Sequence, residues 1–358
     1  MIGRDIYEKL MREIAAGKFT NDGKLPSESS LCDTFTASRM TVRGALAELQ
    51  RQELIEKRNG AGSFLTRRAL RKSGIIGLVI PNFESFGFFA DIKDELERHC
   101  KRLNYKVQLV FTRERNHEAA VRDIRRKVRE LAVARAEGII FRPYVPEEYA
   151  TANREVVRIC QRAEIPVVLI DSDITRPPER SDCDLVAVNN IDAGRRIADH
   201  LHQRGYRQIA FLGEHRGNVR NANWDNRLFG LAGELALLGS ANGVRSLDFK
   251  PTDARALASA LRGKSHVDAI VCGNDESAAA LLTTLRELGK RVPEDVAVIG
   301  FDDIALARTT VPPLTTISQP IRKIAATAIK SLLARIRYPN NDPCEIFLSA
   351  PLVPRRSA

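Results

Sequence analysis

Residues 38–49 read Ser-Arg-Met-Thr-Val-Arg-Gly-Ala-Leu-Ala-Glu-Leu, a stretch with the periodicity of an amphipathic helix. Its apolar side chains recur at i, i+3, i+4 and i+7 and share one helix face: Val42, Ala45, Leu46 and Leu49. The opposite face holds the small residues Gly44 and Ala47, and Arg39 lies in the first turn. The stretch therefore predicts a helix whose apolar face packs against the rest of its domain. Its opposite face has small side chains, so another molecule can approach that face closely.

Shorter patterns on both sides of this helix complete a small domain. A first helix is predicted by apolar residues that recur every four positions: Ile6, Leu10 and Ile14. Ser27, which follows a proline, is the expected N-cap of a second helix. Residues 54–58 and 62–65 predict two short strands around an Asn59-Gly60 turn. Three helices and a two-stranded wing make a winged helix-turn-helix.

From residue 74 the pattern changes to apolar strands that alternate with amphipathic helices. The predicted strands are 75–80, 107–111, 138–141, 167–170, 185–188, 209–212, 269–272 and 296–300. Such alternation is typical of parallel sheets covered on both faces, and the region is long enough for two lobes. We therefore expect an α/β fold with three parts: a winged helix-turn-helix at 1–68, a basic linker at 69–73, and a two-lobed domain with doubly wound parallel sheets at 74–358.

The composition excludes several classes of protein. The chain has 358 residues, with 56 Lys and Arg against 45 Asp and Glu, and 44% of its residues are hydrophobic, as expected of a globular protein. No apolar run is long enough to span a membrane, and the N-terminus lacks the apolar core of a secretion signal. Six cysteines lie far apart without a C-x-x-C pair. We therefore expect no disulfide or metal site and a cytoplasmic location.

The N-terminal region is the more basic part of the chain. Residues 1–72 hold 14 Lys and Arg against 9 Asp and Glu, which suits double-stranded DNA as a partner. Arg39 can donate two parallel hydrogen bonds to a guanine, and the Asn59-Gly60 turn can reach a minor groove. Three hydroxyl groups near helix N-termini can donate to phosphates: Ser27, Ser38 and Thr41.

Three motifs in this region resemble the GntR-family winged helix. They are LPSESSL at 25–31, SRMTVRGAL at 38–46 and GAGSF at 60–64. The resemblance implies base contact by Arg39, DNA-backbone contact by Thr41 and Arg43, and minor-groove approach by the wing at 59–61. The chain departs from the family pattern at Ser29, where many members carry a DNA-contacting Arg, and at Ala61, where the wing is often basic.

Polar side chains follow the predicted strands at the edge where doubly wound sheets bind ligands. Asp171, Asn274 and Asp302 come at the ends of three strands, and Arg227 opens a helix after the loop that follows 209–212. Forked carboxylate, amide and guanidinium groups pair with adjacent hydroxyls, such as those of a sugar. Aromatic rings cover the apolar faces of a sugar, and the candidate platforms are Phe88, Phe89 and Trp224.

The second region resembles the LacI/GalR-family effector domain, which is itself similar to periplasmic sugar-binding proteins. The motifs that carry the resemblance are IGLVIP at 76–81, GII at 138–140, IPVVLID at 165–171, GYRQIAFLG at 205–213, NRLFG at 226–230, ND at 274–275, VIGFDD at 298–303 and PPLTTI at 312–317. The resemblance implies polar ligand contacts by Asp171, Arg227, Asn274 and Asp302, and stacking by Phe88. The combination resembles the arabinose-repressor subgroup, which implies a homodimer that a mono- or disaccharide releases from its operator.

Several of these residues also fit structural roles. Asp171 and Asp275 could be helix N-caps, because Asp is common in that position after a strand. Trp224 fits packing as well as stacking, and Phe89 is expected in the core. Arg142 and Arg220 are expected on the surface. If a second arginine did line the site, an acidic sugar would become a plausible ligand.

Two other functions remain open at this point. The first is a corepressor-dependent regulator that senses a non-sugar metabolite, such as a purine or a sugar acid. The second is an enzyme, but the chain has no G-x-S-x-G, H-E-x-x-H or P-loop motif, and its six histidines are scattered. We therefore expect no catalytic residue, no cofactor and no membrane partner.

Overall fold

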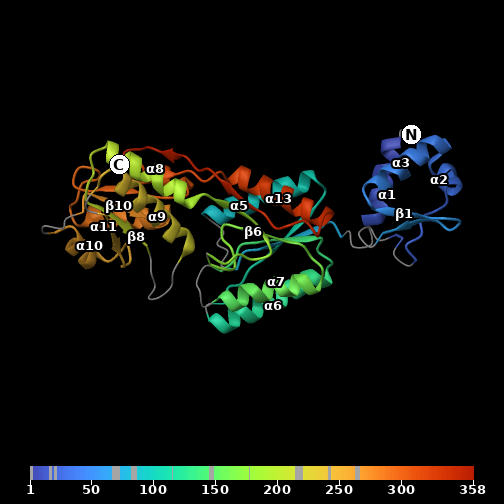
Figure 1. The fold of residues 1–358 in the computed structure, drawn as a ribbon, viewed down its shortest axis with the longest axis horizontal. Coiled ribbons are helices and arrows are strands. Elements are labelled where there is room, and N and C mark those ends of the chain that lie inside the picture. The colour runs from blue at the N-terminus through green and yellow to red at the C-terminus, as the bar shows by residue number, and fades with distance from the viewer. Residues whose placement is uncertain are drawn as a thin grey trace.

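The computed structural model describes residues 3–15, 18–19, 22–66, 73–81, 87–114, 116–144, 149–176, 178–213, 221–240, 243–262 and 267–358. Figure 1 shows an N-terminal helical unit beside two α/β lobes. Most of the expected linker, together with Arg220, lies outside the described residues. None of the described helices is both long and apolar enough to cross a membrane.

The N-terminal unit is the expected winged helix-turn-helix. It contains α1 (Gly3–Ala15), α2 (Glu28–Phe35), α3 (Arg39–Arg51), β1 (Ile55–Arg58) and β2 (Gly62–Leu65). The apolar faces read from the sequence meet in one core, where Ile6, Leu46 and Leu49 are almost completely buried. Ser27 and Ser38 cap α2 and α3, each accepting a hydrogen bond from a backbone N–H in the first turn. The wing strands are antiparallel, with Arg58 opposite Gly62, so residues 59–61 form the tip.

The first lobe, which we call the N-lobe, is built on a six-stranded parallel sheet. Its strands, in spatial order, are β13 (Glu345–Leu348), β7 (Asp184–Val188), β6 (Val167–Ile170), β5 (Gly138–Phe141), β3 (Ile75–Val79) and β4 (Lys106–Val110). Helices α5 (Phe88–Arg102) and α13 (Ile321–Arg337) cover one face, and α6 (His117–Val133) and α7 (Ala150–Arg162) cover the other (Figure 1). The carboxyl ends of these strands point toward the second lobe.

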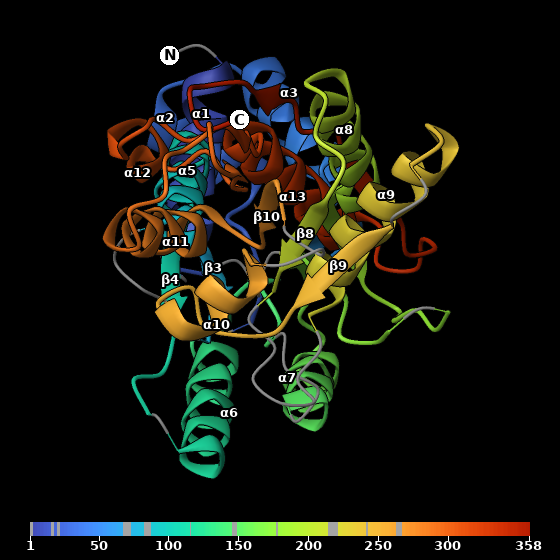
Figure 2. The same cartoon turned by 90° about the vertical axis from the view of Figure 1, so that its left-hand side faces the viewer.

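The second lobe, the C-lobe, has a four-stranded parallel sheet. Its strands, in spatial order, are β11 (Ala297–Ile299), β10 (Ala269–Cys272), β8 (Ile209–Leu212) and β9 (Val244–Leu247). Helices α8 (Asn190–Gln203) and α9 (Ala222–Leu237) pack closely together, while α10 (Ala254–Ala260), α11 (Asp275–Glu287) and α12 (Ala305–Thr309) complete the lobe (Figure 2). Both lobes are doubly wound parallel sheets, as the sequence predicts.

The chain crosses between the lobes three times, and the crossings lie next to one another. The first joins β7 to α8, the second joins β12 (Thr316–Ile317) to α13, and the third joins β13 to β14 (Leu352–Val353). Backbone hydrogen bonds tie the crossings together, from Asn189 N to Leu348 O and from Ser318 N to Pro351 O, each 2.8–2.9 Å long. The three linked crossing segments form a hinge about which the lobes can open and close.

The predicted strands appear within one residue of their expected bounds, but four short strands are missing from the prediction: β9, β12, β13 and β14. Strand β9 lies at a sheet edge and has exposed polar residues in its middle, so it lacks the continuous apolar run of the central strands. Strand β13 is also an edge strand and alternates exposed with half-buried residues. All six cysteines are unpaired, and four of them are buried.

Candidate functional site

A cavity of about 290 Å³ lies between the two lobes at the carboxyl ends of their strands. It contains all six residues proposed from the sequence as ligand contacts: Phe88, Asp171, Trp224, Arg227, Asn274 and Asp302. Six further residues complete its lining: Phe89, Arg142, Asn221, Asn223, Glu276 and Gln319. Ligand cavities in proteins start at about 300 Å³, so the space is close to the size of a small ligand.

Asp171 lies on the N-lobe side of this cavity, directly after β6. Its φ of 74°, together with a 2.9 Å hydrogen bond from Ser172 N to Ile170 O, makes it the centre of a tight γ-turn. A non-glycine residue in this conformation is strained, which is typical of functional sites. Asn223 Nδ2, from the C-lobe, donates to Asp171 Oδ1 at 2.9 Å. The alternative role as a helix N-cap is wrong, because no helix starts at this residue.

Arg227, in α9, is the buried cation on the C-lobe side. Its Nε donates to Asn190 Oδ1 at 2.8 Å, and its Nη1 donates to the carbonyl oxygen of Gly273. The guanidinium also lies over the Phe301 ring, 3.3 Å from the centroid. Burial lowers the pKa of Arg227 to about 10, even though nearby carboxylates favour its charged form. The group therefore stays charged at neutral pH and is held rigidly in place.

Asp302 follows β11 and has a φ of 122°, in a region that favours glycine. Gln319, at the second crossing between the lobes, donates to Asp302 Oδ1 at 2.6 Å. Burial raises the pKa of Asp302 well above its ordinary value, and the positive charge of Arg227 opposes that rise. Asp302 and Arg227 therefore offer a ligand both an acceptor and donors in a water-poor site.

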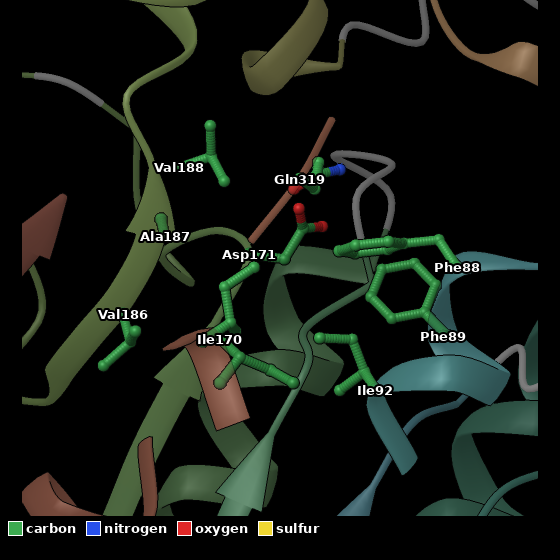
Figure 3. Close-up of a pocket in the computed structure, with 10 residues that line it drawn as sticks. Phe88, Phe89, Ile92, Ile170, Asp171, Val186, Ala187, Val188 and Gln319 are labelled. Carbon is green, nitrogen blue, oxygen red and sulfur yellow. The ribbon is translucent and has the colours of Figure 1, made fainter. Parts of the chain in front are cut away.

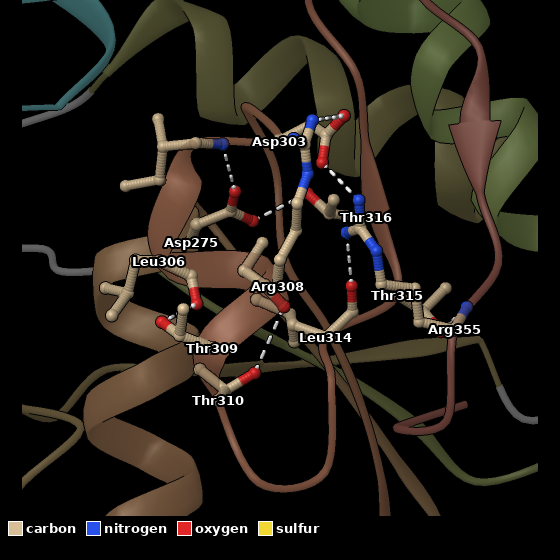
Figure 4. Close-up of polar contacts among 12 residues, drawn as sticks. Asp275, Asp303, Leu306, Arg308, Thr309, Thr310, Leu314, Thr315, Thr316 and Arg355 are labelled. Carbon is tan, nitrogen blue, oxygen red and sulfur yellow. Dashed lines mark hydrogen bonds and ion pairs between the residues drawn. The ribbon is translucent and has the colours of Figure 1, made fainter.

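Asn274, and not Asp275, is the N-cap of the helix that follows β10. Asn274 is the N-cap of α11, with its side chain accepting from Ser277 N at 2.9 Å, while its Nδ2 donates to Glu276 at 3.1 Å. Asp275 is completely buried and accepts hydrogen bonds from Thr316 Oγ1 and Ile304 N (Figure 4). The expected N-cap role of Asp275 is therefore wrong. Asn274 lines the cavity and caps the helix at once.

Asp275 predicts a pH dependence of stability, because burial raises its pKa to about 6. Between about pH 4 and pH 6 the unfolded chain releases this proton while the folded chain keeps it. Stability relative to Asp275→Asn therefore falls as pH rises through that window, by on the order of 3 kcal/mol. Denaturant unfolding of both proteins at several pH values measures the difference.

Asp295 is the matched control for this experiment. It is exposed and paired with Arg291, which lowers its pKa to about 2. The stability that this pair contributes is lost only as pH falls below about 4, so Asp295→Asn leaves the slope between pH 4 and pH 6 unchanged. If wild type and Asp275→Asn have parallel stability curves in that window, Asp275 keeps an ordinary pKa.

The aromatic residues differ from their expected placement. Figure 3 shows the carboxylate of Asp171 beside the Phe88 ring. Phe88 is only 8% exposed and belongs to the hydrophobic core, whereas Phe89, expected in the core, is half-buried and lines the cavity. The guanidinium of Arg142 lies over the Phe89 ring, 4.5 Å from the ring centroid. Trp224 both packs against Gly273 and lines the cavity.

Arg142, expected on the surface, instead lines the cavity. Its side chain is only 15% exposed, and its Nε lies 3.6 Å from Asp171 Oδ2. That Nε is buried and has no hydrogen-bond partner among the described residues. Burial lowers the pKa of Arg142, while Asp171 opposes the shift. The sequence feature that indicates a cavity position for Arg142 is its place directly after β5, which is equivalent to the place of Asp171 after β6.

Four other lining residues were missed by the sequence analysis: Asn221, Asn223, Glu276 and Gln319. Asn221 is the N-cap of α9, and Asn223 lies in the first turn of that helix. Glu276 lies in the first turn of α11, two residues after Asn274. These three belong to helix N-termini that face the cavity, which was the available signal. The sequence offered no such feature for Gln319, because Gln319 reaches Asp302 only through the crossing between the lobes.

The proposed DNA-contacting residues of α3 and the wing tip are exposed, except Thr41, which is half-buried. Arg39, Met40 and Gly44 are exposed on α3, opposite its buried face. Arg43 forms an ion pair with Glu28 at 2.8 Å, so its guanidinium is oriented before any DNA arrives. At the wing, Asn59 and Gly60 are exposed at the tip.

Basic residues beside the wing were also missed. Arg58 lies over the Phe64 ring, 4.4 Å from its centroid, and Lys24 lies 5.8 Å from the same ring. Both positive groups are therefore held next to the tip, so the wing is basic although Ala61 is not. The sequence signal was the KR pair at 57–58 immediately before the turn.

Comparison with known families assigns both parts. Residues 2–65 match bacterial regulatory proteins of the gntR family, and residues 198–358 match the periplasmic binding protein-like domain. The chain joins a GntR winged helix to a LacI-type effector domain. The same arrangement, a small DNA-binding unit followed by a two-lobed domain, is what the geometry above presents.

Several similar proteins are transcriptional regulators. The arabinose metabolism transcriptional repressor of Geobacillus stearothermophilus is 26% identical, over 98% of this chain and 96% of that protein. The HTH-type transcriptional repressor PurR of Vibrio atlanticus is 28% identical, over 79% of this chain and 80% of that protein. A solved complex of the transcriptional regulator CelR with cellobiose has a TM-score of 0.66 and 23% identity, covering 89% of this chain and 90% of that one.

Proposed function

We propose that the protein is a ligand-responsive transcriptional repressor of carbohydrate-utilisation genes. The observation that carries this proposal is the interlobe cavity, where forked polar groups and aromatic rings surround a space of ligand size. The effector we propose is a mono- or disaccharide, which contacts Phe88, Asp171, Trp224, Arg227, Asn274 and Asp302. We assign the chain no catalytic role and a cytoplasmic location, where its DNA lies.

The proposed DNA contacts follow from the exposed faces of the winged helix. Arg39 reads a base edge, and Ser27, Ser38, Thr41 and Arg43 position the domain on the phosphates, with Asn59 and Gly60 in the minor groove. We propose a division into 1–68, 69–73 and 74–358, and a homodimer that places two winged helices on the halves of a near-palindromic operator. Such symmetry doubles the contacts that one chain can make.

Closure of the cleft couples the two functions. Asn223 from the C-lobe donates to Asp171 of the N-lobe, so the side chains that line the cavity also join the lobes. A ligand that binds between them changes this contact and the angle at the three crossings. The angle in turn sets the spacing of the two winged helices. A hundredfold loss of operator affinity needs only about 2.8 kcal/mol of such coupling.

The experiment has two stages. A thermal-shift screen against pentoses, hexoses, disaccharides, uronates and purines identifies the effector, and a gel-shift titration then measures affinity for the promoter of the protein's own gene. We expect saturating effector to lower operator affinity by about 100-fold, with salt weakening the complex steeply. Equal affinity with and without a bound effector contradicts the proposal.

Arg39→Ala separates the two functions. Arg39 lies on the exposed face of α3 in the winged helix and does not line the interlobe cavity, so this variant should bind the effector normally. Its preference for operator over unrelated DNA should fall by roughly 10- to 100-fold, the value of one bidentate base contact. A footprint identical to that of wild type contradicts the base-reading role of Arg39.

Arg142 favours a second candidate ligand within the same function. Two arginines, Arg142 and Arg227, line the cavity, and the Nε of Arg142 has no hydrogen-bond partner among the described residues. A carboxylate of a sugar acid would be attracted by the positive charges of these two arginines. The uronates in the screen test this candidate directly against the neutral sugars.

A further inference from the structure

Helices α6 and α7, which cover one face of the N-lobe sheet, carry an excess of positive charge (Figure 1). Together they contain eight Arg and Lys against four Asp and Glu. Each of the four carboxylates forms an ion pair, and these pairs use four of the basic residues: Arg122, Arg125, Arg126 and Lys127. A fifth, Arg154, donates to the hydroxyl of Thr151 at 3.3 Å. Three basic residues remain: Arg129, Arg158 and Arg162.

These three residues, which we call the arginine cluster, are exposed and unpaired. None of them forms an ion pair or a side-chain hydrogen bond within the part of the chain that the structure describes. Arg158 and Arg162 lie one turn apart on α7, and like charges at this spacing destabilise a helix. The neighbouring arginines of α6 are neutralised by acids one turn away, as Arg122 is by Glu118. A local excess of unpaired cations of this kind is typical of a surface that meets an anion.

The members of the cluster lie near one another, although they come from two helices. An ion pair between Arg125 of α6 and Glu155 of α7 joins the helices side by side. Each helix connects two parallel strands of the same sheet, so α6 and α7 run in the same direction. Arg129 follows Arg125 by one turn, and Arg158 follows Glu155 by about one turn. The cluster therefore occupies the C-terminal ends of both helices.

This end of the N-lobe is where the chain arrives from the winged helix. Glu137, four residues after the end of α6, donates its backbone N–H to the carbonyl oxygen of Ile75 at 2.9 Å, and its carboxylate accepts from Gly74 N at 2.8 Å. Only seven residue steps separate Ser73 from Thr66 of the winged helix, which limits the distance between them to about 25 Å. Any DNA held by the winged helix is therefore kept close to this end of the lobe.

We propose that the arginine cluster binds the phosphate backbone of the DNA next to the half-site that the winged helix occupies. The inference rests on the proposed function, in which the winged helix brings operator DNA to this end of the chain. DNA is a dense row of negative charges, and a guanidinium can donate two parallel hydrogen bonds to one phosphate. Phosphate contacts position a protein without reading its sequence. The cluster therefore adds affinity for DNA and leaves the choice of bases to α3.

The test measures the salt dependence of DNA binding by the full-length protein. The probe is a fragment of the protein's own promoter that carries the operator at its centre and about 20 bp on each side. Replacing Arg129, Arg158 and Arg162 together by glutamine removes three phosphate contacts from each bound chain, so the slope of log affinity against log salt should fall by about 3 per chain. Between about 50 and 200 mM salt the wild type should lose about 40-fold more affinity than this triple variant, per bound chain.

Preference for operator over unrelated DNA is the second measurement. The triple variant should keep the preference of the wild type, because the lost contacts are to phosphates and not to bases. It should also bind the effector normally, since none of the three arginines lines the interlobe cavity.

The matched control replaces three exposed basic residues of the C-lobe by glutamine: Arg204, Lys250 and Lys290. It changes the net charge by the same amount and should keep the wild-type slope. A wild-type slope in the cluster variant overturns the inference, and it is also the result expected if the cluster binds an acidic protein instead of DNA. An equal fall in both variants overturns it as well, because the effect then follows net charge. A wild type that binds operator and unrelated DNA equally contradicts the proposed repressor, whereas a reduced slope in the cluster variant alone still supports the cluster.

Discussion

Arg227→Met should lower effector affinity by at least about 100-fold while leaving operator binding intact. The guanidinium is buried between Asn190, Gly273 and the Phe301 ring, and its positive charge faces Asp302. Losing the hydrogen bonds of a buried charged group to a ligand costs on the order of 3 kcal/mol, which is about 100-fold in affinity. Methionine fills much of the same volume, so the loss reflects charge and hydrogen bonds rather than an empty space.

Isothermal titration with the effector and a gel shift with operator DNA measure the two halves of this prediction. Arg195→Met is the control, because Arg195 lies on the neighbouring helix α8 with a side chain that is 55% exposed. That variant should respond to the effector as wild type does. A normal response in Arg227→Met would place the ligand outside the interlobe cavity.

Gly230→Ala should destabilise the protein by about 3 kcal/mol. Helices α8 and α9 touch backbone to backbone at this point, and a Cβ on Gly230 would overlap the carbonyl oxygen of Ile191. A backbone group cannot rotate away as a side chain can, so the helices must separate, which is the costly form of overpacking. The same separation pulls Arg227, on α9, away from Asn190, on α8, so effector affinity should also fall.

Gly233→Ala tests whether the effect comes from this contact or from the substitution itself. Gly233 lies one turn further along α9, and no atom lies within 4 Å of a Cβ built there. Alanine at that position should stabilise the helix by roughly 0.5 to 1 kcal/mol. Thermal unfolding of both variants measures the contrast. Equal stability of Gly230→Ala and wild type would mean that the two helices are not in contact in solution.

The helices and most strands could be predicted from the sequence because their signals are local. The apolar positions of α3, such as Val42 and Leu49, repeat with the period of a helix face, and the central strands are continuous apolar runs. The prediction missed edge strands such as β9, because one side of an edge strand faces water and tolerates polar residues. Local patterns therefore identify what packs in the interior and miss what lies at the margin.

The six proposed ligand residues line one cavity because a topological rule places them together. Carboxyl ends of parallel strands meet at one edge of a sheet, so Asn274 and Asp302 converge at the edge of the C-lobe sheet, and Asp171 lies at the corresponding edge of the N-lobe sheet across the cavity. The exposed face of α3, which we propose contacts DNA, follows from one helical period. These parts of the site were therefore determined by the sequence.

Only the tertiary structure decided the roles of individual neighbours. Asn274 caps α11 while Asp275 turns into the core, and Phe89 rather than Phe88 is the more exposed ring, because packing angles choose between adjacent side chains. Arg142 and Gln319 reach the cavity for the same reason, one by its orientation after β5 and the other through a crossing between the lobes. The sequence determined which elements form and which strand ends meet, since both depend on local periodicity and chain direction. The fold alone set the direction of each side chain, since that depends on contacts between residues far apart along the chain.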